Sequence, residues 1–228
     1  MLDAIRRVLG EALFPSRCIG CQRRGTALCA GCRTALPYLP RGLCPRCATR
    51  RGAAACRGCG HLSSALSAIH AAFAYEGAAR NAVVTLKFRS GRYLVPLMGE
   101  LLRESLAVRP LVADLVVPVP LSGARLRSRG FNQAALLAGC VAPAVRGVLA
   151  EDVLSRADRP AQRTLTAAQR RSNLEGAFAC ARGLELAGKR VLLVDDVVTT
   201  GATVSTCADT LARAGAGSVR VLAFARDL

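Results

Sequence analysis

The sequence predicts an α/β fold with a doubly wound, mostly parallel sheet, preceded by a small metal-binding module. Three observations support this prediction. From residue 63 onward, apolar strand patterns alternate with helical patterns, as βαβ units require. One apolar run, Val191–Val194, leads directly into two carboxylates and a turn rich in threonine and glycine. Residues 16–62 contain four CxxC pairs and have almost no apolar periodicity.

The composition permits a medium-sized domain with a core of its own. The chain has 228 residues, 52% of them hydrophobic, and no tryptophan, so the core must be built mainly from Ala, Val and Leu. No apolar run approaches the ~20 residues of a membrane span. The residues near the N-terminus include several charged ones, so they lack the apolar region that a signal peptide requires. We therefore expect a cytoplasmic protein without membrane insertion.

Three segments follow from these patterns. Residues 1–15 read as a short amphipathic helix that Pro15 ends. Residues 16–62 are rich in Gly, Pro, Arg and Cys, so metal binding must supply their folding energy. Residues 63–228 form the α/β domain. Its expected strands are 68–75, 115–120, 191–194 and 218–224, and its expected helices are 78–88, 93–106, 132–141 and 202–214.

The CxxC pairs predict two structural zinc sites. In the cytoplasm, clustered cysteines favour metal over disulfides, and two CxxC pairs supply the four thiolates of a tetrahedral zinc ion. The simplest pairing is sequential, which makes the module a double zinc ribbon. One ion is then held by Cys18, Cys21, Cys29 and Cys32, and the other by Cys44, Cys47, Cys56 and Cys59. An interleaved arrangement, with the first pair joined to the third, is also open to this spacing.

The run Val191–Thr203 combines the elements of a phosphate-binding site. The carboxyl end of a parallel strand, followed by a helix N-terminus, is a favourable place for a phosphorylated ligand. Asp195 and Asp196 are the candidate catalytic carboxylates, which suit ribose hydroxyls directly or through Mg²⁺. The candidate phosphate-binding residues are Thr199, Thr200, Gly201, Ala202 and Thr203. This string resembles the phosphoribosyl-diphosphate (PRPP) loop of type I phosphoribosyltransferases.

The resemblance implies a partner site for pyrophosphate and a limit on the acceptor. The basic run 117–133 and the helix end near Lys87 offer the cations, with Lys87, Ser122, Gly123 and Arg129 as candidates. An ordinary solvated loop is the alternative for this run. Purine salvage enzymes of this fold resemble the pattern with an extra acid just before Thr-Gly, where this chain has Thr199. This difference argues against purine salvage, and the sequence does not identify an acceptor.

The whole chain resembles the ComF family of bacteria, with its ComFC-like and GntX-like proteins. The residues that carry the resemblance are the CxxC pairs, Leu86–Phe88, the Arg-Gly-Phe-Asn-Gln motif at 129–133, the lid candidates Gln162, Arg170 and Asn173, and the PRPP loop. The family implies a double zinc ribbon joined to a type I phosphoribosyltransferase fold. It also implies a link to natural transformation, in which single-stranded DNA enters the cytoplasm. The lid departs from the family pattern at Arg159. An exposed basic helix is the alternative for the lid.

Charge points to a polyanionic partner as well. The formal net charge is +17, and residues 1–60 carry eleven arginines against two acids. The sequence therefore supports two hypotheses of function. One is binding or transfer of a phosphoribosyl group from PRPP with Mg²⁺. The other is a binding module for single-stranded DNA, which uses the arginines of residues 17–57 and has a sensory or vestigial PRPP site. A solvated basic surface is the third reading of the charge.

Overall fold

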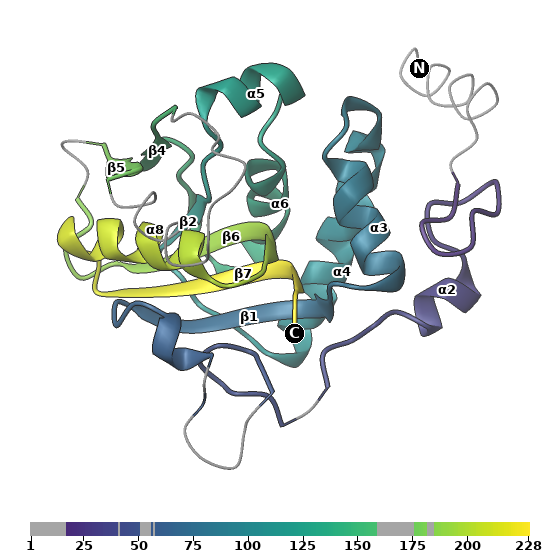
Figure 1. Ribbon diagram of the computed structural model, residues 1–228, viewed down its shortest axis with the longest axis horizontal. Helices are drawn as coiled ribbons and strands as arrows, with labels where there is room; N and C mark the ends of the chain where they lie inside the picture. The colour runs from purple at the N-terminus through teal and green to yellow at the C-terminus, as the bar shows by residue number, and fades with distance from the viewer. Residues whose placement is uncertain (1–16, 41, 51–55, 57, 159–175, 182–184) are drawn as a thin grey trace.

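Five parallel strands form the central sheet, in the order β1-β7-β6-β2-β3 (Figure 1). The computed structural model describes residues 17–40, 42–50, 56, 58–158, 176–181 and 185–228. The predicted helix at 1–15 lies outside these residues. The predicted boundary between residues 62 and 63 stays a prediction.

Each strand and helix expected within residues 63–228 is present, and shorter elements that the sequence did not predict are added to them. The strands are β1 (Leu66–Ala74), β2 (Leu115–Pro118), β3 (Val148–Leu149), β6 (Arg190–Val198) and β7 (Ser218–Arg226), with a separate antiparallel pair of β4 (Leu154–Arg156) and β5 (Phe178–Cys180). The helices are α2 (Ala30–Thr34), α3 (Gly77–Leu86), α4 (Val95–Val108), α5 (Gly123–Arg129), α6 (Gln133–Val141) and α8 (Ala202–Arg213). Short 3₁₀ turns are η1 (Cys59–His61), η2 (Arg89–Leu94) and η3 (Pro143–Val145).

Helices cover both faces of the sheet, which makes the fold doubly wound as predicted. Successive residues of a strand point to opposite faces. In β6, Leu192 and Val194 pack in a core with α3, α4 and α6, whereas Val191 and Leu193 pack in a second core with α8. Figure 1 shows α8 lying along one face of β6 and β7, apart from the other three helices.

The central strand β6 is longer than the sequence predicted. The expected strand ended at Val194, but β6 keeps its pairing with β7 as far as Val198 opposite Arg226. The two carboxylates that follow Val194 break the apolar pattern without breaking the backbone ladder. On its other side, β6 loses its partner, because β2 ends at Pro118 opposite Val194. Proline cannot donate to a ladder, so it suits this strand end. The edge of β6 is therefore open from Asp195 onward.

The cysteine-rich segments pack on the sheet domain at two separate places. Ile19 and Leu36 join the core of α3, α4 and α6, while Cys44, Cys47 and Leu62 join the core of α8. Figure 1 shows the segment with α2 beyond α3, and the segment that precedes β1 beneath that edge strand. Each cysteine-rich segment thus belongs to a different hydrophobic core.

No helix in the described part of the chain is long and apolar enough to cross a lipid bilayer.

Candidate functional site

A cavity of about 190 Å³ opens where β2 leaves the edge of β6. We call it the strand-end cavity. Its walls come from the segment after β2, the ends of α3 and α5, the start of α6, strand β4 and the outer part of β6. The lining residues are Lys87, Val119, Pro120, Leu121, Arg125, Arg129, Gln133, Arg156, Asp195, Asp196, Val197 and Thr203. Predicted residues that lie far apart in the sequence therefore meet at the carboxyl end of the sheet.

The two predicted carboxylates lie side by side at this cavity. The amide of Asp196 donates to Oδ1 of Asp195 at 2.8 Å, and the amide of Val197 donates to Oδ1 of Asp196 at 3.0 Å. Burial raises the pKa of Asp195 well above its usual range, and the charge of Asp196 raises that pKa further. A divalent cation or a ligand hydroxyl would relieve this repulsion, since both interact favourably with ionised carboxylates.

Asp196 holds a buried oxygen atom that lacks a hydrogen bond. The residue is 3% exposed, and its Oδ2 accepts no hydrogen bond from the described residues. Nζ of Lys87, at the end of α3, lies 3.4 Å from this oxygen. Buried carboxylate oxygens normally have hydrogen-bond partners. An oxygen that is ion-paired with Lys87 but accepts no hydrogen bond from the described residues fits a site that takes a cation such as Mg²⁺, or a donor group of a ligand.

Four cations surround the two carboxylates. Lys87, Arg125, Arg129 and Arg156 all line the strand-end cavity. Arg129 donates from Nη1 to Oε1 of the buried Gln133, which fixes the guanidinium at the start of α6. Burial lowers the pKa of both Arg129 and Arg156, but arginine stays protonated in proteins. The cavity thus offers more positive than negative charge and suits a polyanion.

Two predicted pyrophosphate residues, Ser122 and Gly123, lie at the start of α5 and not in the lining of the cavity. The sequence suggested a basic loop here, but the segment is a seven-residue helix that Ser122 caps. Asp158 holds its first turn by accepting a hydrogen bond from the amide of Ala124 at 2.8 Å and one from Nη2 of Arg127 at 3.2 Å. Lys87 and Arg129 are the pyrophosphate candidates that face the cavity.

The predicted phosphate loop forms a smaller cavity of about 50 Å³ next to the first. Thr199, Thr200, Gly201, Ala202 and Thr203 all line it. Asp195, Val197 and Thr203 line both cavities, so the two spaces are neighbours at the end of β6. The loop leads into the twelve-residue helix α8, whose N-terminal amides favour an anion.

Gly201 gives the loop its shape. It has a left-handed backbone, with φ of 82°, which favours glycine. A Cβ at this position would lie 2.5 Å from Cδ2 of Leu62. The loop therefore packs directly on the residue that follows the second cysteine cluster.

The predicted lid residues Gln162, Arg170 and Asn173 lie outside the described residues.

The cysteines gather in two clusters, and their pairing is sequential. Within each cluster the four sulfur atoms lie within 4.8 Å of one another. The first cluster contains Cys18, Cys21, Cys29 and Cys32, and the second contains Cys44, Cys47, Cys56 and Cys59. The interleaved alternative is therefore wrong.

The donor set of both clusters fits zinc. Neighbouring sulfurs lie 3.7 Å apart in the first cluster, between Cys18 and Cys29, and 3.3 Å apart in the second, between Cys47 and Cys56. Tetrahedral Zn–S bonds of about 2.3 Å place sulfurs about 3.8 Å apart. Despite burial, which raises the pKa of Cys18, backbone N–H groups that point at its sulfur lower that pKa to about 6, whereas hydrogen bonds to the neighbouring sulfurs raise the pKa of Cys32 to about 12. The thiols of this cluster thus hold protons that a zinc ion would displace.

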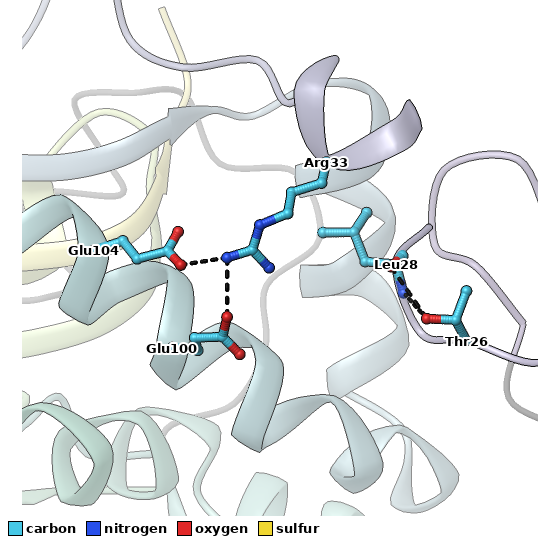
Figure 2. Close-up of polar contacts among 5 residues, drawn as sticks. All are labelled: Thr26, Leu28, Arg33, Glu100 and Glu104. Atoms are coloured by element: carbon cyan, nitrogen blue, oxygen red, sulfur yellow. Dashed lines mark hydrogen bonds and ion pairs between the residues drawn. The ribbon is translucent and has the colours of Figure 1, made fainter. Parts of the chain in front are cut away.

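An ion pair joins the first cluster to the sheet domain (Figure 2). Nη2 of Arg33, in α2, lies 2.9 Å from Oε1 of Glu100 and also contacts Glu104, both in α4. Figure 2 also shows Thr26, whose hydroxyl donates to the carbonyl of Leu28 at 3.1 Å and shapes the approach to α2. Exposed ion pairs contribute little stability, so this link orients the module more than it stabilises it.

Two functional candidates were not predicted from the sequence. Arg156 lines the cavity from β4, with its guanidinium 5.2 Å from the centre of the Phe178 ring. No motif marks it, because β4 is only three residues long. Arg226, the last residue of β7, is buried and donates to the carbonyls of Val198 and Thr199, where the phosphate loop begins. In the sequence, the one sign of a role for Arg226 is its position near the end of a predicted buried strand.

The fold agrees with comparisons to known proteins. Residues 114–228 match the family model described as the phosphoribosyl transferase domain. Competence protein F of Haemophilus influenzae is 28% identical over 235 residues, which cover 93% of this chain and 98% of that protein. Competence protein ComFC of Streptococcus pneumoniae is 28% identical over 88% of each chain. The DNA utilization protein YhgH of Salmonella typhi is 38% identical over 63% of this chain and 65% of that protein.

Among solved structures, the allosteric regulatory enzyme of purine biosynthesis is similar, with a TM-score of 0.39 and 22% identity. The similarity covers 57% of this chain and 26% of that chain. The family match spans β2, β6, β7 and the predicted phosphate loop, and it contains every lining residue of the strand-end cavity except Lys87. The chain therefore belongs to the phosphoribosyl transferase domain family, and it is of the ComF type, with two four-cysteine clusters before a type I phosphoribosyltransferase fold.

Proposed function

We propose that the chain binds PRPP with Mg²⁺ at the end of β6 and serves in DNA uptake. The observation that carries the proposal is the meeting of three groups at one place. Asp195 and Asp196 can hold the ribose hydroxyls and the cation, the Thr199–Thr203 loop can hold the 5′-phosphate, and Lys87 and Arg129 face the cavity where pyrophosphate would lie. The names of the relatives, a competence protein and a DNA utilization protein, support the context of DNA uptake.

Mg²⁺ would be held by Asp195 and by the carboxylate of Asp196, whose Oδ2 accepts no hydrogen bond from the described residues. When bound, it would supply positive charge to the ligand's pyrophosphate and ribose oxygens. Arg129 and Arg156 would orient the same groups. Thr199 occupies the position just before the Thr-Gly pair of the loop, where purine salvage enzymes of this fold carry an acid. The loop therefore offers no carboxylate to handle the proton of a purine base.

Calorimetric titration of PRPP with Mg²⁺ into zinc-loaded protein tests this proposal. Replacing both carboxylates, Asp195→Asn and Asp196→Asn, preserves shape and removes the charge. We expect affinity to fall at least about tenfold, the scale of one lost hydrogen bond to a charged group. The exposed pair Glu151→Gln and Asp152→Asn is the matched control, with the same change in charge. Equal affinity in both double variants would exclude the site.

A second function, binding of single-stranded DNA, is favoured by the cysteine-rich surface. Arg17, Arg23, Arg24 and Arg50 are exposed there, whereas Arg33 contacts the glutamates of α4. Tyr38, the only aromatic residue of segment 16–62, packs against Phe73 with ring centres 5.1 Å apart. Base stacking on this surface is thus weak, and DNA binding would rely on phosphates with little sequence preference.

The salt dependence of DNA binding tests this second function. With about four phosphates neutralised, the slope of log affinity against log salt should be near −3. The triple change Arg23→Gln, Arg24→Gln and Arg50→Gln should flatten the slope. The control, Arg109→Gln, Arg146→Gln and Arg213→Gln, alters the charge equally on the sheet domain and should not. A slope near zero in the unaltered protein would leave the arginines as a solvated surface.

A further inference from the structure

Arg226 is a buried cation whose hydrogen bonds go to backbone carbonyls. It ends β7, between β1 and β6, and is 3% exposed. Its Nε donates to the carbonyl of Cys47 at 3.1 Å. Its Nη1 donates to the carbonyl of Val198 at 2.9 Å, to that of Asp227 at 2.9 Å, and to that of Thr199. A buried charge is costly unless it is fully hydrogen-bonded, so these contacts hold the guanidinium in one place.

The acceptors of Arg226 belong to two different parts of the molecule. Cys47 is one of the four cysteines of the second cluster, in the turn that starts at Cys44. Val198 and Thr199 are the residues at which β6 turns into the phosphate loop. One guanidinium therefore joins the metal-binding turn to the backbone of the loop. Its planar array of donors keeps fixed angles between them, which a flexible lysine would not.

Further contacts join the same two parts. Leu62, just after the second cluster, lies against Gly201 of the loop. The amide of Ser63 donates to Oγ of Ser205 at 3.2 Å, and the hydroxyl of Ser63 donates to Asp209, both in α8. Cys44, Cys47 and Leu62 also share a hydrophobic core with Val198 and Val204. The loop and its helix thus pack on the second cluster through a shared core and through Leu62 and Ser63, which follow that cluster.

The first cluster makes its contacts elsewhere. Ile19 packs in the core of α3, α4 and α6, and its carbonyl accepts a hydrogen bond from Asn81 at 2.8 Å. Arg33 reaches α4. Among the described residues, these contacts do not touch residues 198–203. Both clusters consist of four cysteines, but only the second is connected to the phosphate loop by the contacts of Arg226.

We propose that Arg226 is a positioning residue that couples metal occupancy of the second cysteine cluster to the conformation of the phosphate loop. Metal in the second cluster fixes the turn at Cys44–Cys47, Arg226 transmits this position to Val198 and Thr199, and the loop amides then face the ligand. Coupling between two sites is reciprocal, so a ligand in the loop also retains the metal of the second cluster. This last consequence rests on the proposed PRPP site, whereas the coupling of cluster and loop does not.

Hydrogen exchange followed by mass spectrometry tests the coupling without any ligand. In zinc-loaded protein, Arg226→Met should speed exchange in peptides that cover residues 44–48 and 198–203 by about tenfold, the effect of one lost hydrogen bond to a charged group. Arg226→Lys should restore part of the protection. Arg220→Met, an exposed position on the same strand, is the control and should leave both peptides unchanged. Equal exchange in the Arg226 and Arg220 variants would overturn the proposal.

Zinc release from the unaltered protein tests it without a mutation that could impair folding. Release to a chromophoric chelator should show two ions per chain, and Mg²⁺ with PRPP should slow one of them about tenfold and leave the other unchanged. If PRPP binds but slows neither ion or both alike, the coupling is wrong and the proposed function stands. If PRPP does not bind at all, the proposed function fails, and the exchange experiment alone decides the role of Arg226.

Discussion

At Gly201, a left-handed backbone coincides with close packing on Leu62. Asp196, in the same part of the chain, is a buried carboxylate whose Oδ2 accepts no hydrogen bond from the described residues. Both residues lie where β6 meets the loop. Glycine adopts this left-handed backbone without strain, whereas the unsatisfied oxygen of Asp196 carries a cost that a bound cation or ligand donor would offset. Such departures from ordinary local preferences are typical of functional sites.

Replacing Gly201 tests how closely the loop depends on this geometry. Gly42→Ala is a matched control, because Gly42 has almost the same φ, 83° against 82°, and no neighbouring atom within 4 Å of a new Cβ. The control should cost about 1–2 kcal/mol of unfolding free energy from backbone strain. Gly201→Ala should cost more, because its Cβ meets Leu62, and should also weaken PRPP binding. Chemical denaturation and calorimetry measure the two effects. Identical results for both variants would show that the contact with Leu62 has no consequence.

Individual site residues differed in how far the sequence revealed them. The carboxylates and the loop were predictable, because they are contiguous and follow a buried strand. Lys87 and Arg129 were predicted as candidates, and the structure places both at the cavity. Arg156 and Arg226 carry no local signal, since their roles come from what the folded chain brings beside them. Only the packing of β4 and β7 against distant segments reveals them.

At the scale of elements, the errors have physical causes. The sequence-based end of β6 was too early, because two carboxylates interrupt an apolar run although the ladder with β7 continues. Helix α5 was taken for a loop because none of its residues is buried, so it has no apolar period. Its helix depends instead on the cap by Ser122 and on the carboxylate of Asp158 at its first turn.

An ion pair between the amino ends of β2 and β6 gives an element-scale prediction. Arg190 donates to Asp114 from Nη2 at 2.7 Å, from Nε at 3.1 Å and from its backbone amide at 2.7 Å. These hydrogen bonds hold the pKa of Asp114 well below its ordinary value of 3.8. The charged form is favoured in the folded state, so the resulting stability is present above about pH 4 and is lost as the pH falls towards the lowered pKa.

Asp114→Asn should therefore destabilise the protein at neutral pH and reduce the loss of stability in acid. Thermal unfolding at several pH values measures this, with the exposed Asp152→Asn as the control. The melting temperatures of the unaltered protein and of Asp114→Asn should converge as the pH falls below 4. A constant difference down to the lowest pH would mean that the pair does not contribute through the charge of Asp114.

At the scale of the whole molecule, the cysteine-rich segment packs on the sheet domain at two places, one at each hydrophobic core. The fold class and both clusters followed from the sequence, since CxxC spacing and apolar alternation are strong local patterns. The placement of the clusters on different cores did not, because it depends on contacts such as Ile19 with α3 and Leu62 with the phosphate loop. These contacts are set by tertiary packing and have no counterpart in a motif.

Metal content gives a prediction at this scale. Each cluster has four thiols and no open position, so two structural zinc ions should be bound per chain. Elemental analysis of protein purified without chelator measures the number. Removal of zinc should lower the melting temperature, because both hydrophobic cores include residues of the cysteine-rich segment. One zinc ion per chain would mean that one cluster is idle, and none would exclude the zinc-ribbon interpretation.

Titration of PRPP into the zinc-loaded, unaltered protein, with and without Mg²⁺, decides whether the end of β6 is a PRPP site. We expect one PRPP bound per chain with Mg²⁺ present. Without Mg²⁺ the affinity should be weaker by at least about tenfold, because the carboxylates would then face the ligand without a cation between them. Absence of PRPP binding in the presence of Mg²⁺ would exclude a PRPP site there.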